Sequence, residues 1–147
     1  MNWQTAFTLI NALVLPAWVL LIFLPKKKLT RTLVHSMLWP LVMGAIYTVS
    51  LVAAIFFGQS HPDAGFTMSG VVALFQHPNG VITGWTHYLV FDLFVGAWIG
   101  RDSQRHGIAH WQAIPCILFS FLFGPVGLVL YALLRLIHGK GFSLFED

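Results

Sequence analysis

Charged residues are scarce in this sequence. They make up 9% of the 147 residues, against 57% hydrophobic residues, whereas a soluble globular domain carries about 25% charged residues. So little charge cannot cover a large water-facing surface, which argues against a soluble class. The composition predicts an integral membrane protein.

Cysteine and several catalytic patterns are almost absent as well. Cys116 is the single cysteine, so an intrachain disulfide is excluded. The sequence has no glycine-rich phosphate loop, no serine nucleophile elbow and no two-cysteine redox motif. We therefore expect no cofactor, which leaves cofactor-free chemistry on an apolar substrate, or plain binding.

Long apolar runs are what the sequence has instead. A helix needs roughly 20 apolar residues to cross a bilayer, and four runs reach that length: 5–24, 33–57, 82–100 and 111–134. They predict an all-α protein, a single domain over 1–147 built as a bundle of four transmembrane helices. The first run lacks a basic leader and ends in LPKKK, so we do not interpret it as a cleaved signal peptide.

The longest connection, 58–81, reads GQSHPDAGFTMSGVVALFQHPNGV. It is rich in Gly and Pro but contains the apolar patch MSGVVALFQ. We expect a short interfacial helix there, lying over the bundle. The alternative is a plain connecting loop.

The basic residues are distributed unevenly along the chain. Six lie in two short loops, against two after the last run: Lys26, Lys27, Lys28, Arg31, Arg101 and Arg105, against Arg135 and Lys140. By the positive-inside rule, both termini lie on the non-cytoplasmic side of a bacterial inner membrane. The net charge of +3 is explained by these loops, so membrane lipids are expected partners and nucleic acid is not.

Asp92 is the one carboxylate inside an apolar run. A charge at that depth costs roughly 2.5–3.5 kcal/mol on insertion scales, so it must face a partner or a wet cavity. Trp85 and Tyr88 share its helix face, whereas His87 lies about 140° away around the helix. A buried neutral Asp92 is a useful proton donor. The alternative is an interhelical pin, bonded to a backbone carbonyl or to Tyr47.

The last run contains FLFGPVGLVLY. Pro125 cannot donate a backbone hydrogen bond, so we expect a kink in a continuous helix. Gly124 and Gly127 allow a neighbouring helix or a flat ligand to come close, although helix packing alone explains them equally well. Arg135 has Tyr131 one turn below it, and it either snorkels to the interface or reaches a polar pocket with His87. His87 itself could do no more than bond across helices.

Asp102, His106 and His110 are spaced four and four, which is the spacing of metal ligands on one helix face. The signal is weak because a glycine interrupts it. We therefore expect no metal, and we expect Asp102 to cap the turn and to pair with Arg101 or Arg105 at the lipid interface.

The segment GWTHYLVFDLFVGAWIGRDS, followed by HW, PC and FLFGPVGLVLYALLR, resembles the membrane family typified by plant neoxanthin synthase, the abscisic-acid-deficient-four proteins. The resemblance is densest over 84–135. It implies a four-span protein that acts on carotenoids, opening an epoxide ring to give an allene and a hydroxyl group. This sequence departs from the plant type in lacking a transit peptide.

The resemblance also implies roles for particular residues. Asp92 would be the acid, His87 the base and Tyr88 an assisting group, and no redox cofactor is needed. A carotenoid-like rod would lie in an aromatic-lined groove. The expected substrate-binding residues are Trp85, Trp98, Gly124, Pro125, Tyr131 and Arg135.

Two other functional classes remain open from the sequence. One is a non-catalytic carotenoid- or lipid-binding subunit that assists another membrane protein. The other is a small proton-coupled transporter, in which Asp92 relays protons and a second copy of the chain completes the transport path.

Overall fold

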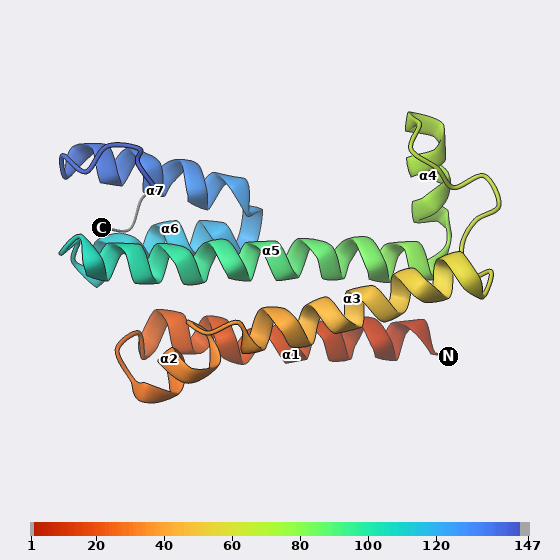
Figure 1. Ribbon diagram of the computed structural model, residues 1–147, viewed down its shortest axis with the longest axis horizontal. Helices are drawn as coiled ribbons and strands as arrows, with labels where there is room; N and C mark the ends of the chain where they lie inside the picture. Colours follow the sequence, from red (N-terminus) through yellow and green to blue (C-terminus); the bar gives the residue numbers. More distant parts are fainter. Residues whose placement is uncertain (1, 145–147) are drawn as a thin grey trace. The chain divides into compact units, whose positions relative to one another are not determined.

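The computed structural model describes residues 2–144, and within them the chain is helical and contains no strand (Figure 1). The predicted all-α class is therefore confirmed. The helices are α1 (Trp3–Phe23), α2 (Lys28–Leu33), α3 (Leu38–Phe56), α4 (Met68–Gln76), α5 (Pro78–Arg105), α6 (His110–Phe123) and α7 (Pro125–Ile137).

The contacts within the chain define two compact units. The first comprises the residues up to Leu15 together with Trp39–Val90, and the second comprises Pro16–Leu38 together with the residues from Phe91 onward. Helices α1 and α5 each contribute their N-terminal part to the first unit and their C-terminal part to the second. The single domain predicted from the sequence stays a prediction.

The first unit contains α3, α4 and the N-terminal halves of α1 and α5. Helix α4 begins after Thr67, whose hydroxyl accepts a hydrogen bond from the Gly70 amide at 3.1 Å, as an N-cap residue does. The short helix predicted within 58–81 is therefore present, and Figure 1 shows it standing crosswise to the start of α5. Its interfacial position stays a prediction.

A buried amide joins two elements of the first unit. The Asn79 side chain, 1% exposed, donates hydrogen bonds to the Ser50 carbonyl at 2.9 Å and to the Gln59 carbonyl at 3.0 Å. These bonds connect the beginning of α5 to α3 and to the chain that follows it. Since buried carbonyls need partners, this one side chain helps to fix where α5 begins.

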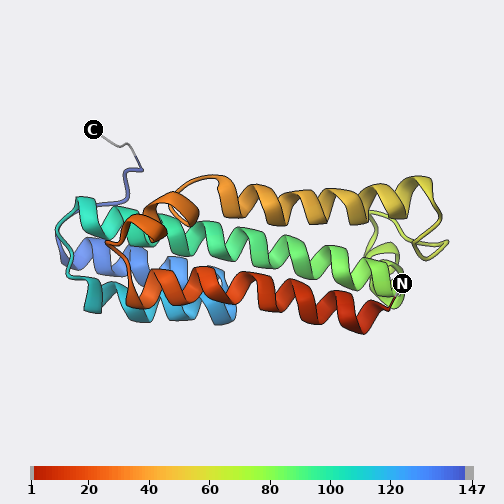
Figure 2. The same cartoon turned by 90° about the horizontal axis from the view of Figure 1, so that it is seen from below.

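The second unit corrects the prediction for the last apolar run. The run 111–134 is not one kinked helix but two helices, α6 and α7, because the chain breaks at Gly124 (φ 46°, ψ −93°). A positive φ is readily adopted by glycine, and Pro125 then starts α7 in the position where its missing N–H matters least. Both views show α7 doubling back along α6, beside the second half of α5 (Figure 1, Figure 2).

Close packing holds this hairpin together. A Cβ atom on Gly127 would collide with the Cys116 carbonyl and the Ser120 backbone, so the two helices approach closely at this point. Helices α6 and α7 have 14 and 13 residues, fewer than the roughly 20 that a bilayer crossing requires. The prediction of one spanning helix over 111–134 is therefore wrong, because the structure has two shorter helices there.

Helices α1 and α3 are long and apolar enough to cross a membrane. Within α3 the buried residue is Met43, so most of its apolar side chains face outward. An apolar helix with so little buried surface suits a lipid environment better than water. Length and composition alone are weak evidence for spanning, and the four-span bundle is not confirmed.

Candidate functional site

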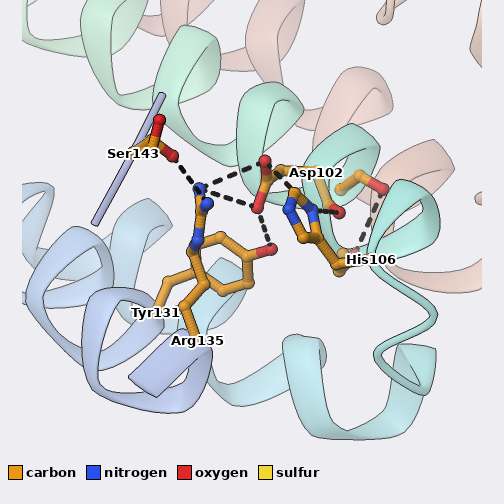
Figure 3. Close-up of polar contacts among 7 residues, drawn as sticks. Asp102, His106, Tyr131, Arg135 and Ser143 are labelled. Carbon is orange, nitrogen blue, oxygen red and sulfur yellow. Dashed lines mark hydrogen bonds and ion pairs between the residues drawn. The ribbon is translucent and has the colours of Figure 1, made fainter. Parts of the chain in front are cut away.

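A buried ion pair joins α5 to α7 in the second unit (Figure 3). The Arg135 Nη1 atom lies 3.2 Å from each carboxylate oxygen of Asp102, and the Tyr131 hydroxyl donates to Asp102 Oδ2 at 2.6 Å. All three side chains are buried. Both carboxylate oxygens accept hydrogen bonds, so Asp102 is held as a carboxylate.

Two further contacts complete this cluster. Arg135 Nη2 donates to the Ser143 carbonyl at 2.7 Å, which ties the segment after α7 to the helix. His106, one turn after Asp102, has its Nδ1 atom 3.5 Å from Asp102 Oδ1. We call Asp102, His106, Tyr131 and Arg135 the charged cluster.

The charged cluster corrects two predictions. Arg135 is buried and bonded to Asp102, so it does not snorkel to an interface. Asp102 takes Arg135 as its ion-pair partner, where the sequence predicted an arginine of its own loop. Both errors come from the hairpin, because a single spanning helix would have carried Arg135 to the end far from Asp102.

An aromatic ring and an apolar cavity adjoin the charged cluster. Trp98, one turn before Asp102, meets the Tyr131 ring edge-on at 5.3 Å and 88°, and the Arg135 guanidinium lies 6.0 Å from its ring centre. A cavity of ≈ 230 Å³ opens beside Trp98. Its lining is apolar: Phe94, Val95, Trp98, Leu128 and Leu144.

Asp92 lies at the turn of the hairpin. Its side chain is 6% exposed, and a Cβ atom on Gly124 would collide with its carboxylate. The Ser120 hydroxyl donates to the Asp92 carbonyl at 3.3 Å. The structure therefore brings Asp92 together with Gly124 and Pro125, where the carboxylate is next to the first turn of α7.

The other residues assigned to chemistry belong to the first unit. The Trp85 indole donates to Asn11 Oδ1 at 3.1 Å and stacks on Tyr88 at 5.3 Å. His87 is exposed, and its ring lies 5.6 Å from that of Tyr47. His87 and Tyr88 thus share one unit, and Asp92 belongs to the other. Their catalytic roles stay predictions.

Three aromatic residues of the first unit form a continuous series of ring contacts. Phe7 contacts Trp85 at 5.7 Å, and Trp85 in turn stacks on Tyr88. Phe7 also lines a cavity of ≈ 400 Å³ with residues from α1, the end of α4 and the start of α5. We call Phe7, Trp85 and Tyr88 the aromatic series.

The three spaced residues considered as metal ligands do not converge. His106 lies beside Asp102, but His110 Nε2 bonds to the Ile22 carbonyl at 2.9 Å. Within residues 2–144, no group of three His, Cys, Asp or Glu side chains is placed to hold a metal ion. The helix also ends at Arg105, which breaks the spacing that the sequence suggested.

One more residue of the second unit, His35, has a pKa shifted by its surroundings. His35 lies in the bend between α2 and α3, where a Cβ on Gly100 would be 3.3 Å from its ring. Burial lowers the pKa of His35, and the positive charge of Arg101 lowers it further. His35 therefore favours its neutral form in the folded protein.

Sequence reasoning missed the pairing of Asp102 with Arg135. The available signals were the Gly-Pro pair at 124–125, which marks turns, and the spacing of Tyr131 and Arg135, which places both on one face of a helix. A turn at 124 would have directed that face back toward α5.

The comparisons with known proteins agree with the resemblance. A family model described as ABA DEFICIENT 4-like matches residues 5–131. The protein "ABA DEFICIENT 4, chloroplastic" of Arabidopsis thaliana is 24% identical over 136 residues, covering 86% of this chain and 58% of that protein. No solved structure matches.

The bacterial assignment finds no support here, since this relative is chloroplastic by name. With the family model matching most of its length, the chain belongs to the ABA DEFICIENT 4-like family.

Proposed function

We propose that this chain is a membrane-embedded carotenoid-modifying protein, and that it isomerises a carotenoid epoxide to an allenic alcohol. The observation that carries the proposal is the family match over residues 5–131, together with the resemblance of that family to neoxanthin synthase. The chain spans 58% of the length of the Arabidopsis relative, and the matched residues include the proposed catalytic residues His87, Tyr88 and Asp92.

Apolar surface supports a substrate that dissolves in the bilayer. The outward-facing side chains of α3 and the apolar cavity beside Trp98 both suit a hydrocarbon rod. The aromatic series offers flat rings on which a polyene can lie, and Trp85 and Tyr88 are stacked with an interplanar angle of 24°. Ligand sites with apolar walls and few polar groups are the usual kind.

The reaction needs one acid and one base. The acid protonates the epoxide oxygen as its C–O bond breaks, and the base removes a proton from the adjacent polyene carbon. One proton enters and one leaves, so the product is an isomer of the substrate and no redox partner is required.

Among the described residues, two carboxyl groups are buried, and Asp92 is the better of them for the acid role. Asp102 already accepts hydrogen bonds from Tyr131 and Arg135, and a carboxylate in an ion pair has no proton to give. Asp92 is buried on the same helix, about three turns earlier, beside Gly124 and Pro125. His87 is the proposed base and Tyr88 the assisting group, because His87 is exposed to an approaching substrate.

The proposed membrane arrangement has three crossings and one re-entrant hairpin. Helices α1, α3 and α5 cross, and the α6–α7 hairpin enters and returns to the side of Asp102. All eight Lys and Arg residues then lie on one side, which the positive-inside rule favours over a split. This arrangement would put the two termini on opposite sides; the arrangement predicted from the sequence, with both termini on the non-cytoplasmic side, stays a prediction.

The experiment is pigment analysis of cells that accumulate violaxanthin and express this chain, with cells carrying an empty vector as the control. We expect a new pigment of unchanged mass with the shortened chromophore of an allene. An unchanged profile with pigment copurifying on the protein would contradict isomerisation and support a binding subunit. An unchanged profile without bound pigment would contradict the carotenoid function altogether.

A further inference from the structure

The apolar cavity beside Trp98 lies between two contacts that join α5 to α7. At one end, the Asp92 carboxylate lies against Gly124, next to the start of α7. At the other end, Asp102 is bonded to Arg135. Four lining residues fall between these contacts along the two helices: Phe94, Val95, Trp98 and Leu128. The two helices are therefore joined on either side of the cavity, which makes it a preformed space.

The fifth lining residue, Leu144, comes from the segment after α7. Arg135 Nη2 donates to the Ser143 carbonyl at 2.7 Å, directly before Leu144, and the Arg135 guanidinium lies 6.0 Å from the Trp98 ring centre. One buried arginine of α7 thus contacts the other two elements that line the cavity. Walls that are fixed before a ligand arrives lower the cost of binding a rigid group.

The size and chemistry of the cavity limit what it can hold. An apolar cavity of roughly 150 Å³ binds benzene, whereas sites for whole drug-sized ligands measure roughly 300–1,000 Å³. At ≈ 230 Å³, the cavity suits a six-membered ring with small alkyl substituents, and it is too small for a whole polyene rod. None of the described residues that line it carries a charge, so any oxygen on the ring has to lie at the edge of the cavity, near a polar partner.

We propose that the apolar cavity beside Trp98 binds the terminal ring of the carotenoid, at the end that reacts. This inference rests on the proposed function, in which Asp92 protonates an epoxide oxygen. Such an epoxide is fused to the terminal ring, so the acid and the ring have to meet. Asp92 and the lining residue Val95 share one face of α5, about 4.5 Å apart along the helix axis. A ring against Val95 is therefore within one helical turn of the acid, and the polyene extends from the cavity into the bilayer.

The test uses two ketones of identical composition. β-Ionone contains a methyl-substituted six-membered ring, and pseudoionone is its open-chain isomer. Purified full-length protein in phosphatidylcholine nanodiscs is titrated with each ketone, and binding is followed as the rise in melting temperature. Leu128→Trp fills the cavity from α7. Leu133→Trp is the matched control, because Leu133 belongs to the same helix, is exposed and does not line the cavity.

We expect β-ionone to bind at least roughly tenfold more tightly than pseudoionone, because a closed ring loses less conformational freedom on binding. Leu128→Trp should remove this preference, and Leu133→Trp should keep it. Equal affinities for the two ketones, or equal losses in the two variants, would overturn the proposal. If Leu128→Trp does not fold, Leu128→Phe against Leu133→Phe makes the same comparison.

The ketone titration and the pigment analysis can fail independently. Neither ketone carries an epoxide, so binding of the ring does not depend on catalysis. A preference for the ring without a new pigment in cells supports the cavity as a ring site and contradicts the isomerisation. A new pigment without a preference for the ring contradicts the ring site and leaves the isomerisation in place.

Discussion

The two units solve the problem of buried polar groups in different ways. The first has no Lys or Arg, and its interior contacts are made by neutral groups: the Asn79 amide bonded to two carbonyls, and stacked aromatic rings. The second holds all eight Lys and Arg residues and buries an ion pair, Asp102 with Arg135. Neutral groups are inexpensive to bury when bonded, whereas a buried charge depends entirely on its partner.

This difference suggests a division of roles. Charge gathered in one unit can orient the chain in a membrane, and the aromatic series of the other unit offers an apolar ligand a surface without Lys or Arg. In the second unit, Arg135 lies beside Trp98 of the apolar cavity, and its charge is paired with Asp102, because a cation near an apolar ligand has to be desolvated or paired.

The largest expected effect is on the sidedness of labelling. In a Cys116→Ala background, single cysteines at positions 28 and 140 should react with an impermeant thiol reagent from the same side of sealed vesicles. A cysteine at position 60, in the first unit, should react only from the other side. This expectation rests on the proposed membrane arrangement, in which all the cations lie on the side to which the hairpin returns. Labelling of positions 28 and 140 from opposite sides would restore a single spanning helix over 111–134.

Removing one partner of the buried ion pair should cost the most stability. Arg135→Met leaves the Asp102 carboxylate buried without its cation, and we expect a loss of about 3–5 kcal/mol in unfolding free energy. Asn79→Ala in the first unit breaks two neutral hydrogen bonds and should cost less, about 1–3 kcal/mol. Denaturant unfolding in detergent measures both.

A double variant measures how much Asp102 and Arg135 stabilise the protein as a pair. Asp102→Asn/Arg135→Met should be more stable than the sum of the two single losses predicts, because neither charge is then left alone. Additive losses would mean that the two residues are not coupled, and would break the contrast between the units.

Gly124→Ala should destabilise the hairpin by more than about 1–2 kcal/mol, the usual cost of a left-handed non-glycine residue. The excess comes from the collision of the new Cβ with Asp92. Gly139→Ala is the matched control, since Gly139 also has a positive φ (67°) but nothing lies within 4 Å of its Cβ position. Equal losses in thermal stability would show that the carboxylate does not lie against the turn.

The smallest effect is on pH dependence. Because the pKa of His35 is lowered in the folded state from 6.5, the unfolded chain binds more protons near that pH, and stability falls as pH drops below about 6.5. His35→Gln should flatten this fall when melting temperatures are compared between about pH 7.5 and 5.5. A profile identical to that of the unsubstituted protein would exclude His35 as the cause.

The sequence predicted the helical class and most of the helix positions for a physical reason. Apolar runs of sufficient length report helices directly, and 5–24, 33–57 and 82–100 correspond to α1, α3 and α5. Hydropathy cannot detect a reversal that occurs within one residue. Gly124 and Pro125 are as compatible with an apolar run as with a turn, so 111–134 was interpreted as one helix.

In the candidate site, too, the sequence predicted what a local pattern reports and missed what depends on the turn at Gly124. Asp92 stood out because one carboxylate among apolar residues is costly wherever the chain goes. The ion pair between Asp102 and Arg135 depends on the hairpin, and no local pattern connects positions 33 apart in the chain. The sequence showed the basic residues of both loops. It did not show the cavity that they line, because the loop before α6 also forms its wall.

The most direct measurement of the proposed chemistry is product formation by Asp92→Asn in violaxanthin-accumulating cells, with the amount of folded protein in the membrane measured in parallel. The substitution keeps the volume beside Gly124 and removes the transferable proton. We expect normal accumulation and a loss of at least roughly 100-fold in product, the low end of what a general acid supplies. If the Asp92→Asn variant still forms product at the rate of the unsubstituted chain, that result contradicts the account and leaves Asp92 as a structural support for the turn.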